Sequence, residues 1–451
     1  MTDFRDTMFT TPEMSGIFNG RTLVQRMLDF EAALARAQAG AGMMPAAAAD
    51  GIRAKCRVEL FDVDVLFREG AEAGTLAVPL VGRLTDLVEG EAKKFVHWGT
   101  TTQDVVDTAV MLQSKDGLEL LIGRLLDLGA ACATLAERHR RTVMAGRTFL
   151  QHAVPITFGL KAARWLGLST RLVRKLRFLR AETLAVQLGG AAGTLAGMGE
   201  HGVRVLELLA ENLGLSKPEL PWHTERDRIA EVAAALGVVA GGMGKIAGDI
   251  SLLSQVEVGE VSTGGPAAKG RSSTMPHKRN PVEAAAAAAS ARLAIGMVPI
   301  VLSSAVQEHE RAAGAWQAEW QAVPDLFRFT AGAVEWVYRA MANLQVNAER
   351  MRANLEHTRG QIMAEALTMA LAPRLGRPEA FRLVQRVSDR AAQTGNSLHQ
   401  AAAEDEEIRK AIPPERLERV FDATSYLGSA DAFIDRALAG FRSLRESAGT
   451  R

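Results

Sequence analysis

The chain has 451 residues, which is enough for several domains or for one long helical body with attached ends. Its 53 lysines and arginines balance 52 aspartates and glutamates and leave a net charge of +1. This balance provides no global basic field for nucleic acid or an anionic membrane. We therefore expect a small-molecule ligand that is bound locally, with no nucleic-acid and no membrane partner.

The two cysteines, Cys56 and Cys132, lie far apart in the sequence and form no CxxC motif. They support neither a disulfide framework nor a cysteine zinc site, and they fit a reducing cytoplasm. The first residues, MTDFRDTMFTTPEM, carry acids early and lack an apolar stretch behind basic residues. They predict no secretory signal.

Apolar residues recur at helical spacing along the chain, whereas alternating strand patterns are scarce. One such stripe consists of Leu23, Val24, Met27, Leu28, Leu34 and Ala35, and another of Val105, Val106, Ala109, Val110 and Leu112. Aromatic residues make up only 5% of the chain, and good helix formers abound. The pattern predicts an all-α fold.

Long helical zones follow in the middle of the chain and indicate a bundle, because they exceed the usual helix length. They cover Ser114 to Glu137, Phe158 to Leu188 and Arg228 to Val258, and a fourth begins near Pro281. We expect three parts: an N-terminal helical domain at 1–111, a central long-helix bundle at 112–360 and a C-terminal helical domain at 361–451.

The most membrane-like stretch runs from Ala284 to Val306. Arg292 and Pro299 interrupt it, and about half of it is alanine, which suits a bilayer poorly. The stretch therefore predicts a buried core helix.

Glycine, serine and other small residues make up Ser262 to Ser273, STGGPAAKGRSS, between two helical zones. This composition predicts a mobile loop, and such loops often close over a bound substrate. The residues that end and follow the loop carry the strongest functional signal.

The segment Arg271 to Pro281 reads RSSTMPHKRNP. Asn280, Pro281 and Glu283 form a good helix start, with Asn as N-cap, Pro at the first helical position and Glu at the third. This structural explanation leaves the two serines and the lysine of the segment without a role. Beside a helix N-terminus, such groups can hold a carboxylate and move a proton.

The stretch SSTMPHKRNP resembles the signature loop of the fumarase/aspartase superfamily, usually written GSSxMPxKxNP, and the match is long and specific. Arg271 stands where glycine is usual, which changes the hinge of the loop or places a cation near substrate. The resemblance implies that Ser272 is the catalytic proton carrier, with Ser273 as the alternative. It also implies that Lys278 and Asn280 bind substrate.

A second motif, HWGTTTQDVVDT, covers His97 to Thr108. Thr101 and Asp104 have the spacing of a capping box before an apolar helix, and this structural explanation stays open. The superfamily has a Thr-Ser pair here, matched by Thr101 and Thr102. The resemblance implies that these threonines and His97 bind substrate, and a capped helix N-terminus also presents N–H groups to anions.

A third motif, GRTFLQHAVPITFG, covers Gly146 to Gly159 and resembles the GRTHxQxAxPxTFG region of the superfamily. In most members a histidine follows Gly-Arg-Thr, but this chain has Phe149. His152 matches the histidine of the Leu-Gln-His found in the cycloisomerase branch, although a lone histidine can also be structural. The resemblance implies a catalytic His152 and a substrate-binding Gln151.

The resemblance runs from MLDFEAALARAQ near the start to YLGSADAFIDRAL near the end. It implies a three-domain helical protein that assembles as a homotetramer with active sites shared between subunits. Superfamily members transfer a proton at a carbon next to a carboxylate, which itself delocalises the charge. The resemblance therefore implies a polycarboxylate substrate with no cofactor and no metal.

Within the superfamily the chain most resembles the cycloisomerases that close 3-carboxy-cis,cis-muconate to 4-carboxymuconolactone in protocatechuate catabolism. Phe149 favours this branch, because adenylosuccinate cleavage expels a nitrogen that needs an acid, whereas lactone opening expels a stable carboxylate. An adenylosuccinate lyase-like β-elimination enzyme remains the alternative. A non-enzymatic structural protein is a third hypothesis, against which the retained serine, lysine and asparagine argue.

Overall fold

The structure is a computed structural model that describes residues 4–264 and 270–446 of the chain. Within these residues helices dominate, and the strands form two small two-stranded sheets, so the prediction of an all-α fold is confirmed. The chain divides into two compact units. Unit 1 comprises Met1–Leu125, Leu172–Lys245 and Ala286–Trp336, and unit 2 comprises Leu126–Arg171, Ile246–Ala285 and Val337–Arg451.

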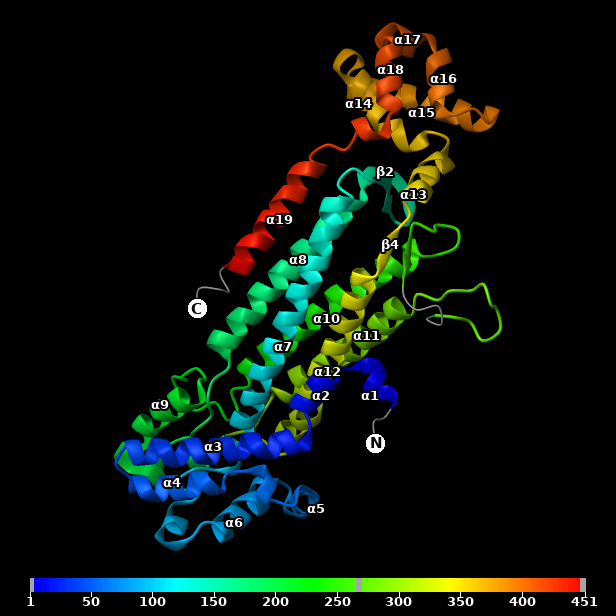
Figure 1. The fold of residues 1–451 in the computed structure, drawn as a ribbon. Coiled ribbons are helices and arrows are strands. Elements are labelled where there is room, and N and C mark those ends of the chain that lie inside the picture. The colour runs from blue at the N-terminus through cyan, green and yellow to red at the C-terminus, as the bar shows by residue number, and fades with distance from the viewer. Residues whose placement is uncertain (1–3, 265–269, 447–451) are drawn as a thin grey trace. The chain divides into compact units, whose positions relative to one another are not determined.

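The elements follow this division, and Figure 1 labels most of them. Unit 1 contains α1 (Phe4–Phe9), α2 (Pro12–Ile17), α3 (Gly20–Gly40), α4 (Ala46–Lys55), α5 (Val63–Ala73), α6 (Ala77–Leu87) and α9 (Gly202–Leu213). Both units take residues from α7 (Thr102–Arg138), α8 (Phe158–Phe178), α10 (Asp227–Leu253), α11 (Val282–Ser304) and α12 (Ala315–Ala342). Unit 2 contains β1 (Val143–Thr148), β2 (Gln151–Thr157), β3 (Val261–Thr263), β4 (Leu344–Val346), α13 (Ala348–Leu355), α14 (Ala364–Leu375), α15 (Arg377–Thr394), α16 (Leu398–Glu404), α17 (Glu406–Ala411), α18 (Pro414–Phe421) and α19 (Ala430–Glu446).

The long helical zones predicted from the sequence each hold a helix whose ends differ somewhat from the prediction. The zone from Ser114 lies inside α7, which begins at Thr102 and is continuous across residue 111. The zone from Phe158 to Leu188 holds α8, which ends at Phe178 before a π-helical turn. The division of the chain into 1–111, 112–360 and 361–451 stays a prediction.

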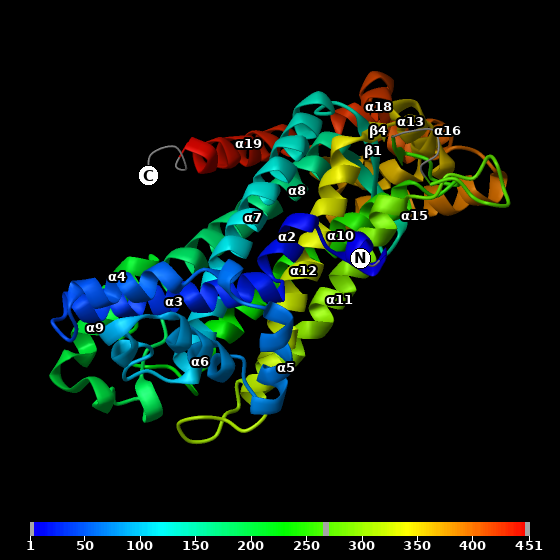
Figure 2. The same cartoon turned by 60° about the horizontal axis from the view of Figure 1, so that its bottom comes forward.

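In unit 1, α3, α4, α5, α6 and α9 enclose an apolar core, and Figures 1 and 2 show α3 lying against α4 and α9. The predicted stripe of α3 lines this core. Its residues Val24, Met27, Leu28, Leu34 and Ala35 are buried, while Leu23 is half-buried. The hydrophobic periodicity therefore identified the buried face of this helix correctly.

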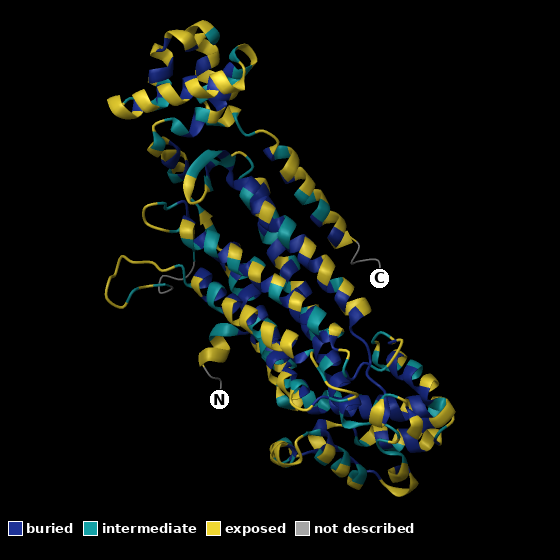
Figure 3. Ribbon diagram, turned by 180° about the vertical axis from the view of Figure 1, so that it is seen from behind, coloured by how far each residue is buried: buried dark blue, intermediate teal, exposed yellow. Residues whose placement is uncertain are grey.

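The segments of α7, α10, α11 and α12 in unit 1 pack as a bundle. Phe18 stacks on Phe327 of α12 with ring centroids 4.6 Å apart. Gly117 of α7 lies against both rings, and a Cβ there would approach Phe327 to 2.9 Å, so only glycine permits this contact. Figure 3 shows buried and exposed residues alternating along the long helices, as a bundle of amphipathic helices requires.

In unit 2, helices α14 to α18 surround a second apolar core around Leu367, Leu383 and Leu398. Strands β1 and β2 form an antiparallel hairpin, which the sequence analysis did not predict. Ala145 of β1 is buried with Ile362 and Met363, so the hairpin is packed against its own unit.

The stretch predicted as a buried core helix forms α11, one of two helices that are long and apolar enough to cross a membrane; the other is α10. Of the most apolar window of each helix, 33% is buried in α11 and 50% in α10. The prediction of a buried helix is thus only partly met within a single chain.

Candidate active site

The signature loop begins and ends in a short antiparallel contact of unit 2. The carbonyl of Gly270 accepts a hydrogen bond from the N–H of Asn280 at 2.8 Å, and Arg271 pairs with Arg279. Gly270 has φ +69°, and a Cβ on it would lie 2.5 Å from the carbonyl oxygen of Asn280. Glycine at this position therefore closes the base of the loop.

This closure changes the predicted helix start. The N–H of Asn280 donates to Gly270 within the loop, and α11 begins at Val282, so Pro281 is the residue before the helix. The carbonyl of Pro281 accepts the first i+4 hydrogen bond, from Ala285. The helix thus starts one residue later than predicted.

Ser272 and Ser273 differ in their hydrogen bonds. The Oγ of Ser272 accepts from the backbone N–H of Thr274 at 3.2 Å and of Met275 at 3.0 Å. Among the described residues, Ser273 makes no side-chain hydrogen bond. Two N–H groups directed at one oxygen stabilise negative charge on it, which favours Ser272 over Ser273 for the predicted proton transfer.

Lys278 and Asn280 are exposed in the single chain, as is Ser273. The mobile loop predicted from Ser262 to Ser273 starts later than expected, since Ser262 and Thr263 belong to β3, which pairs with β4. Residues 265–269 lie outside the described residues, so the mobility of the loop stays a prediction.

The hairpin of β1 and β2 carries the third motif. Its tight turn is formed by Phe149 and Leu150, with φ +49° and +64°, between the paired residues Thr148 and Gln151. A two-residue turn with positive φ at both positions normally uses Asn or Gly, so the backbone of these two bulky residues is strained. The Phe149 side chain is fully exposed, which leaves its apolar surface without cover in the single chain.

His152 lies in β2, opposite Arg147. Its ring stacks on His357 with centroids 6.3 Å apart, and its buried Nδ1 has no hydrogen-bond partner among the described residues. Burial, and then the charge of Arg147, lower the pKa of His152, while Glu260 opposes them. The imidazole is therefore neutral at neutral pH and can accept a proton.

The hairpin is anchored by a buried carboxylate. Arg147 binds Glu260 through two hydrogen bonds of 2.9 and 2.7 Å, and Asn354 donates to the same carboxylate at 2.8 Å. Such a bidentate pair fixes orientation as well as charge. It holds β1, and with it the strand that carries His152.

The second motif forms the N-terminus of α7 in unit 1, where Asp104 acts as a hub. Its carboxylate accepts hydrogen bonds from five groups: the N–H of Thr101, Gly189 and Gly190, the hydroxyl of Thr100 and the Nε2 of His223. Half of the predicted capping box is therefore present, namely the carboxylate of Asp104 receiving the N–H of Thr101. Thr101 and Thr102 stay half-buried at the helix end, available to an anion.

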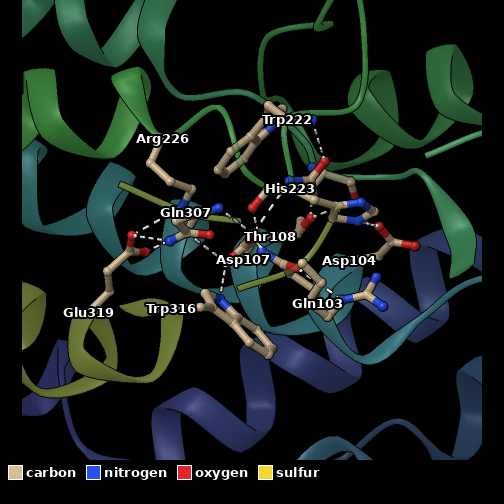
Figure 4. A network of polar contacts seen from close by, with 12 residues as sticks. Gln103, Asp104, Asp107, Thr108, Trp222, His223, Arg226, Gln307, Trp316 and Glu319 are labelled. Carbon is tan, nitrogen blue, oxygen red and sulfur yellow. Dashed lines mark hydrogen bonds and ion pairs between the residues drawn. The ribbon is translucent and has the colours of Figure 1, made fainter. Parts of the chain in front are cut away.

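A second buried network lies one turn further along α7 and is drawn in Figure 4. The Asp107 carboxylate binds Arg226 through both oxygens, at 2.6 and 3.0 Å, and Trp316 Nε1 at 2.9 Å. Arg226 also pairs with Glu319. Burial would lower the pKa of Arg226, but Asp107 and Glu319 outweigh it and raise the pKa, so the guanidinium stays charged.

His97 lies just before α7, and its Nδ1 is 2.6 Å from Oε1 of the buried Glu31 in α3. Unit 1 thus holds His97, Thr101 and Thr102. Unit 2 holds the remaining predicted site residues, which are Gln151, His152, Ser272, Ser273, Lys278 and Asn280. Among the described residues, no hydrogen bond is found between the hairpin and the signature loop.

Asp107 and Arg226 were not predicted from the sequence, and Asp104 was predicted only as part of a helix cap. A signal was present: Asp104 and Asp107 lie three residues apart in the mostly apolar stretch 104–112 of α7, so both face the same way. Buried carboxylates need partners, and this need alone predicts a nearby cation or several N–H donors.

Comparison with known proteins identifies the family. A family model described as "Lyase" matches residues 6–296, and one described as "Adenylosuccinate lyase C-terminus" matches residues 360–437. This chain belongs to the lyase family of the fumarase/aspartase superfamily. It is an enzyme of that superfamily, as the signature loop predicted.

Members of this lyase family match the chain over nearly its whole length. A 3-carboxy-cis,cis-muconate cycloisomerase of Pseudomonas aeruginosa is 45% identical over 442 residues, which cover 97% of this chain and 96% of the relative. The crystal structure of the 3-carboxy-cis,cis-muconate lactonizing enzyme of Pseudomonas putida has a TM-score of 0.91 at 41% identity, with 98% and 100% of the two chains covered. A nitrosuccinate lyase of Streptomyces davaonensis is 41% identical and covers 92% of this chain and 90% of the relative.

Proposed function

We propose that this chain is a 3-carboxy-cis,cis-muconate cycloisomerase of protocatechuate catabolism. The observation that carries the proposal is the full-length agreement with such enzymes, at 45% identity to the Pseudomonas aeruginosa relative and a TM-score of 0.91 to the Pseudomonas putida structure. Phe149 supports it, since lactone chemistry does not need the acid that usually stands there.

The reaction closes a ring within the substrate. A carboxylate oxygen forms a bond to the nearer carbon of the opposite double bond, which closes the lactone. The π electron pair moves to the farther carbon, which lies beside another carboxylate, giving an enediolate. The Oγ–H of Ser272 then donates its proton to that carbon, and the alkoxide that remains is held by the two N–H groups of Thr274 and Met275. The alkoxide of Ser272 then regains a proton from water, which completes the forward reaction. In the reverse direction the alkoxide takes the proton from carbon, and a neutral His152 can accept it from Ser272 to restore the alkoxide.

The substrate is a tricarboxylate, so its binding site needs several cations and donors. Thr101 and Thr102 supply hydroxyl and N–H groups at the start of α7, and His97 lies beside them. Lys278, Asn280 and Gln151 are exposed in the single chain and supply an ammonium group and two amides. No metal and no organic cofactor is required, because the carboxylate beside the reacting carbon delocalises the charge.

We also propose that the enzyme works as a homotetramer with sites shared between subunits. The helices α10 and α11 expose large apolar side chains: Val238, Leu252, Leu293, Ile295, Ile300 and Leu302. Together with the fully exposed Phe149, they leave apolar surface that a neighbouring subunit would bury. A cytoplasmic location completes the proposal, supported by two cysteines that are both buried and unpaired.

The proposed function is tested by incubating the purified protein with 3-carboxy-cis,cis-muconate and following the loss of diene ultraviolet absorbance. Adenylosuccinate and nitrosuccinate serve as parallel substrates. Rapid turnover of the tricarboxylate alone supports the proposal. If the protein turns over either succinate derivative and does not turn over the tricarboxylate, the chain belongs to a β-eliminating branch instead.

Changing Phe149 to histidine separates these branches further. For lactone formation, Phe149→His should not raise kcat, because the expelled group of the reverse reaction is a carboxylate that needs no acid. For an enzyme that expels an amine, the same change should raise kcat by about 10²-fold by restoring protonation of the nitrogen. Steady-state kinetics of both proteins on both substrates distinguish the two, with Phe149→Tyr as a control for the altered ring.

Shared sites predict complementation between inactive variants. If His152 and Ser272 reach one site from different subunits, tetramers mixed from His152→Ala and Ser272→Ala chains contain about a quarter of their sites intact. Co-refolding equal amounts should then restore a comparable fraction of wild-type activity. Each variant refolded alone is the control, and verified hybrid tetramers without activity would contradict the shared site.

A further inference from the structure

Glu31 is a buried carboxylate in the apolar face of α3. It is 1% exposed and lies among the core residues Met27, Phe30 and Leu34. Among the described residues its one hydrogen-bond partner is Nδ1 of His97, at 2.6 Å. An ionised carboxylate in such a core is costly unless it is paired, so Glu31 depends on His97 as its partner.

The segment that carries His97 is held in a strained conformation. His97 has φ +56°, which residues with a Cβ seldom adopt. Helix α3 makes two hydrogen bonds to the segment: Glu31 binds the His97 ring, and Gln38 donates to the carbonyl of Trp98 at 2.6 Å. Glu31 and Gln38 are seven residues apart, hence on the same face of the helix. The ring is therefore fixed in position as well as paired.

The charged groups that shift the pKa of His97 are both carboxylates. Glu31 faces the ring from α3 and Asp104 from α7, while the thiol of Cys56, whose pKa is raised by burial, stays neutral beside Glu31. Burial would lower the pKa of His97, but Glu31 and then Asp104 outweigh it and raise the pKa. With Nδ1 bound to Glu31, Nε2 on the opposite edge of the ring has no partner among the described residues, and the side chain is 19% exposed.

We propose that Glu31 is a positioning residue that holds His97 as a cation and presents its Nε2–H to a substrate carboxylate. This inference rests on the proposed function, because it assigns one carboxylate of the tricarboxylate to a site at the start of α7. The threonines of that helix end supply further donors to the same anion. If Glu31 had only a structural role, its charge would affect stability but not the pH dependence of binding.

The variant that tests the proposal is Glu31→Gln, which keeps the shape and removes the charge. The raised pKa of His97 predicts tight binding below it and loss of binding as pH rises through it. In Glu31→Gln the pKa of His97 is lower, so binding is lost at a lower pH than in the wild type. At pH 7.5 we expect KM for the substrate, and Kd for the unreactive propane-1,2,3-tricarboxylate measured by calorimetry, to rise about tenfold. We expect kcat to change by less than about threefold, and Glu31→Asp to restore part of the binding.

Histidine titration followed by NMR provides a measurement that does not depend on turnover. The His97 signal, identified by its loss in His97→Asn, should titrate at lower pH in Glu31→Gln than in the wild type. The proposal is overturned if His97 titrates at the same pH in Glu31→Gln as in the wild type. It is also overturned if His97 titrates at lower pH but Kd for the tricarboxylate does not change. If the wild type binds propane-1,2,3-tricarboxylate with the predicted pH dependence but does not turn over 3-carboxy-cis,cis-muconate, the proposed function fails and the role of Glu31 stands.

Discussion

Replacing Ser272 with alanine is expected to lower kcat by about 10³-fold while changing KM by less than about threefold. The change removes the group that carries the proton, whereas the groups proposed to hold the carboxylates lie elsewhere in the site. The structure favours Ser272 because its Oγ receives the N–H of Thr274 and Met275. Steady-state kinetics with the tricarboxylate measure both parameters.

The matched control is Ser273→Ala in the neighbouring residue, which should keep kcat within about tenfold of the wild type, since Ser273 lacks the two backbone donors. If Ser273→Ala is the damaging change and Ser272→Ala is mild, the proton carrier is Ser273. If neither change matters, the proposed mechanism is wrong.

Replacing Arg226 with methionine is expected to lower the free energy of unfolding by about 3–5 kcal/mol. Methionine keeps the unbranched apolar stem of the side chain and removes the guanidinium, which lies over the ring of Trp222 at 5.0 Å. The change leaves Asp107 and Glu319 buried together without their cation. Urea unfolding measures the loss, and Arg53→Met, in an exposed pair with Asp50, is the control and should cost less than about 1 kcal/mol.

The destabilisation of Arg226→Met should shrink as pH falls. In the wild type, burial is the largest cause that raises the pKa of Glu319, and Arg226 opposes it. Without Arg226 the folded-state pKa of Glu319 rises further above its unfolded value, so the folded variant binds more protons than the unfolded chain. Stability is then lost as pH rises through that pKa and regained as pH falls. This account would be contradicted if Arg226→Met lost the same free energy of unfolding, relative to the wild type, at pH 8 and at pH 5.5.

Some features of this protein follow from the sequence because they depend on neighbours along the chain. The 3.6-residue spacing of Val24, Met27, Leu28 and Leu34 predicts the buried face of α3, since helix geometry alone determines which side chains share a face. The segment SSTMPHKRNP indicated the superfamily, which the match over residues 6–296 confirms. Even the start of α11 was predicted to within one residue from Pro281 and its neighbours.

Other features were decided by tertiary structure alone. The partners of Asp107 lie 119 residues away, at Arg226, and 209 residues away, at Trp316, and no local pattern specifies such pairs. The pairing of Glu31 with His97 likewise arises only when α3 packs against the segment before α7. Sequence spacing determines local geometry, whereas the burial of charge, and the partner that each buried charge then requires, depend on which distant segments meet in the folded chain.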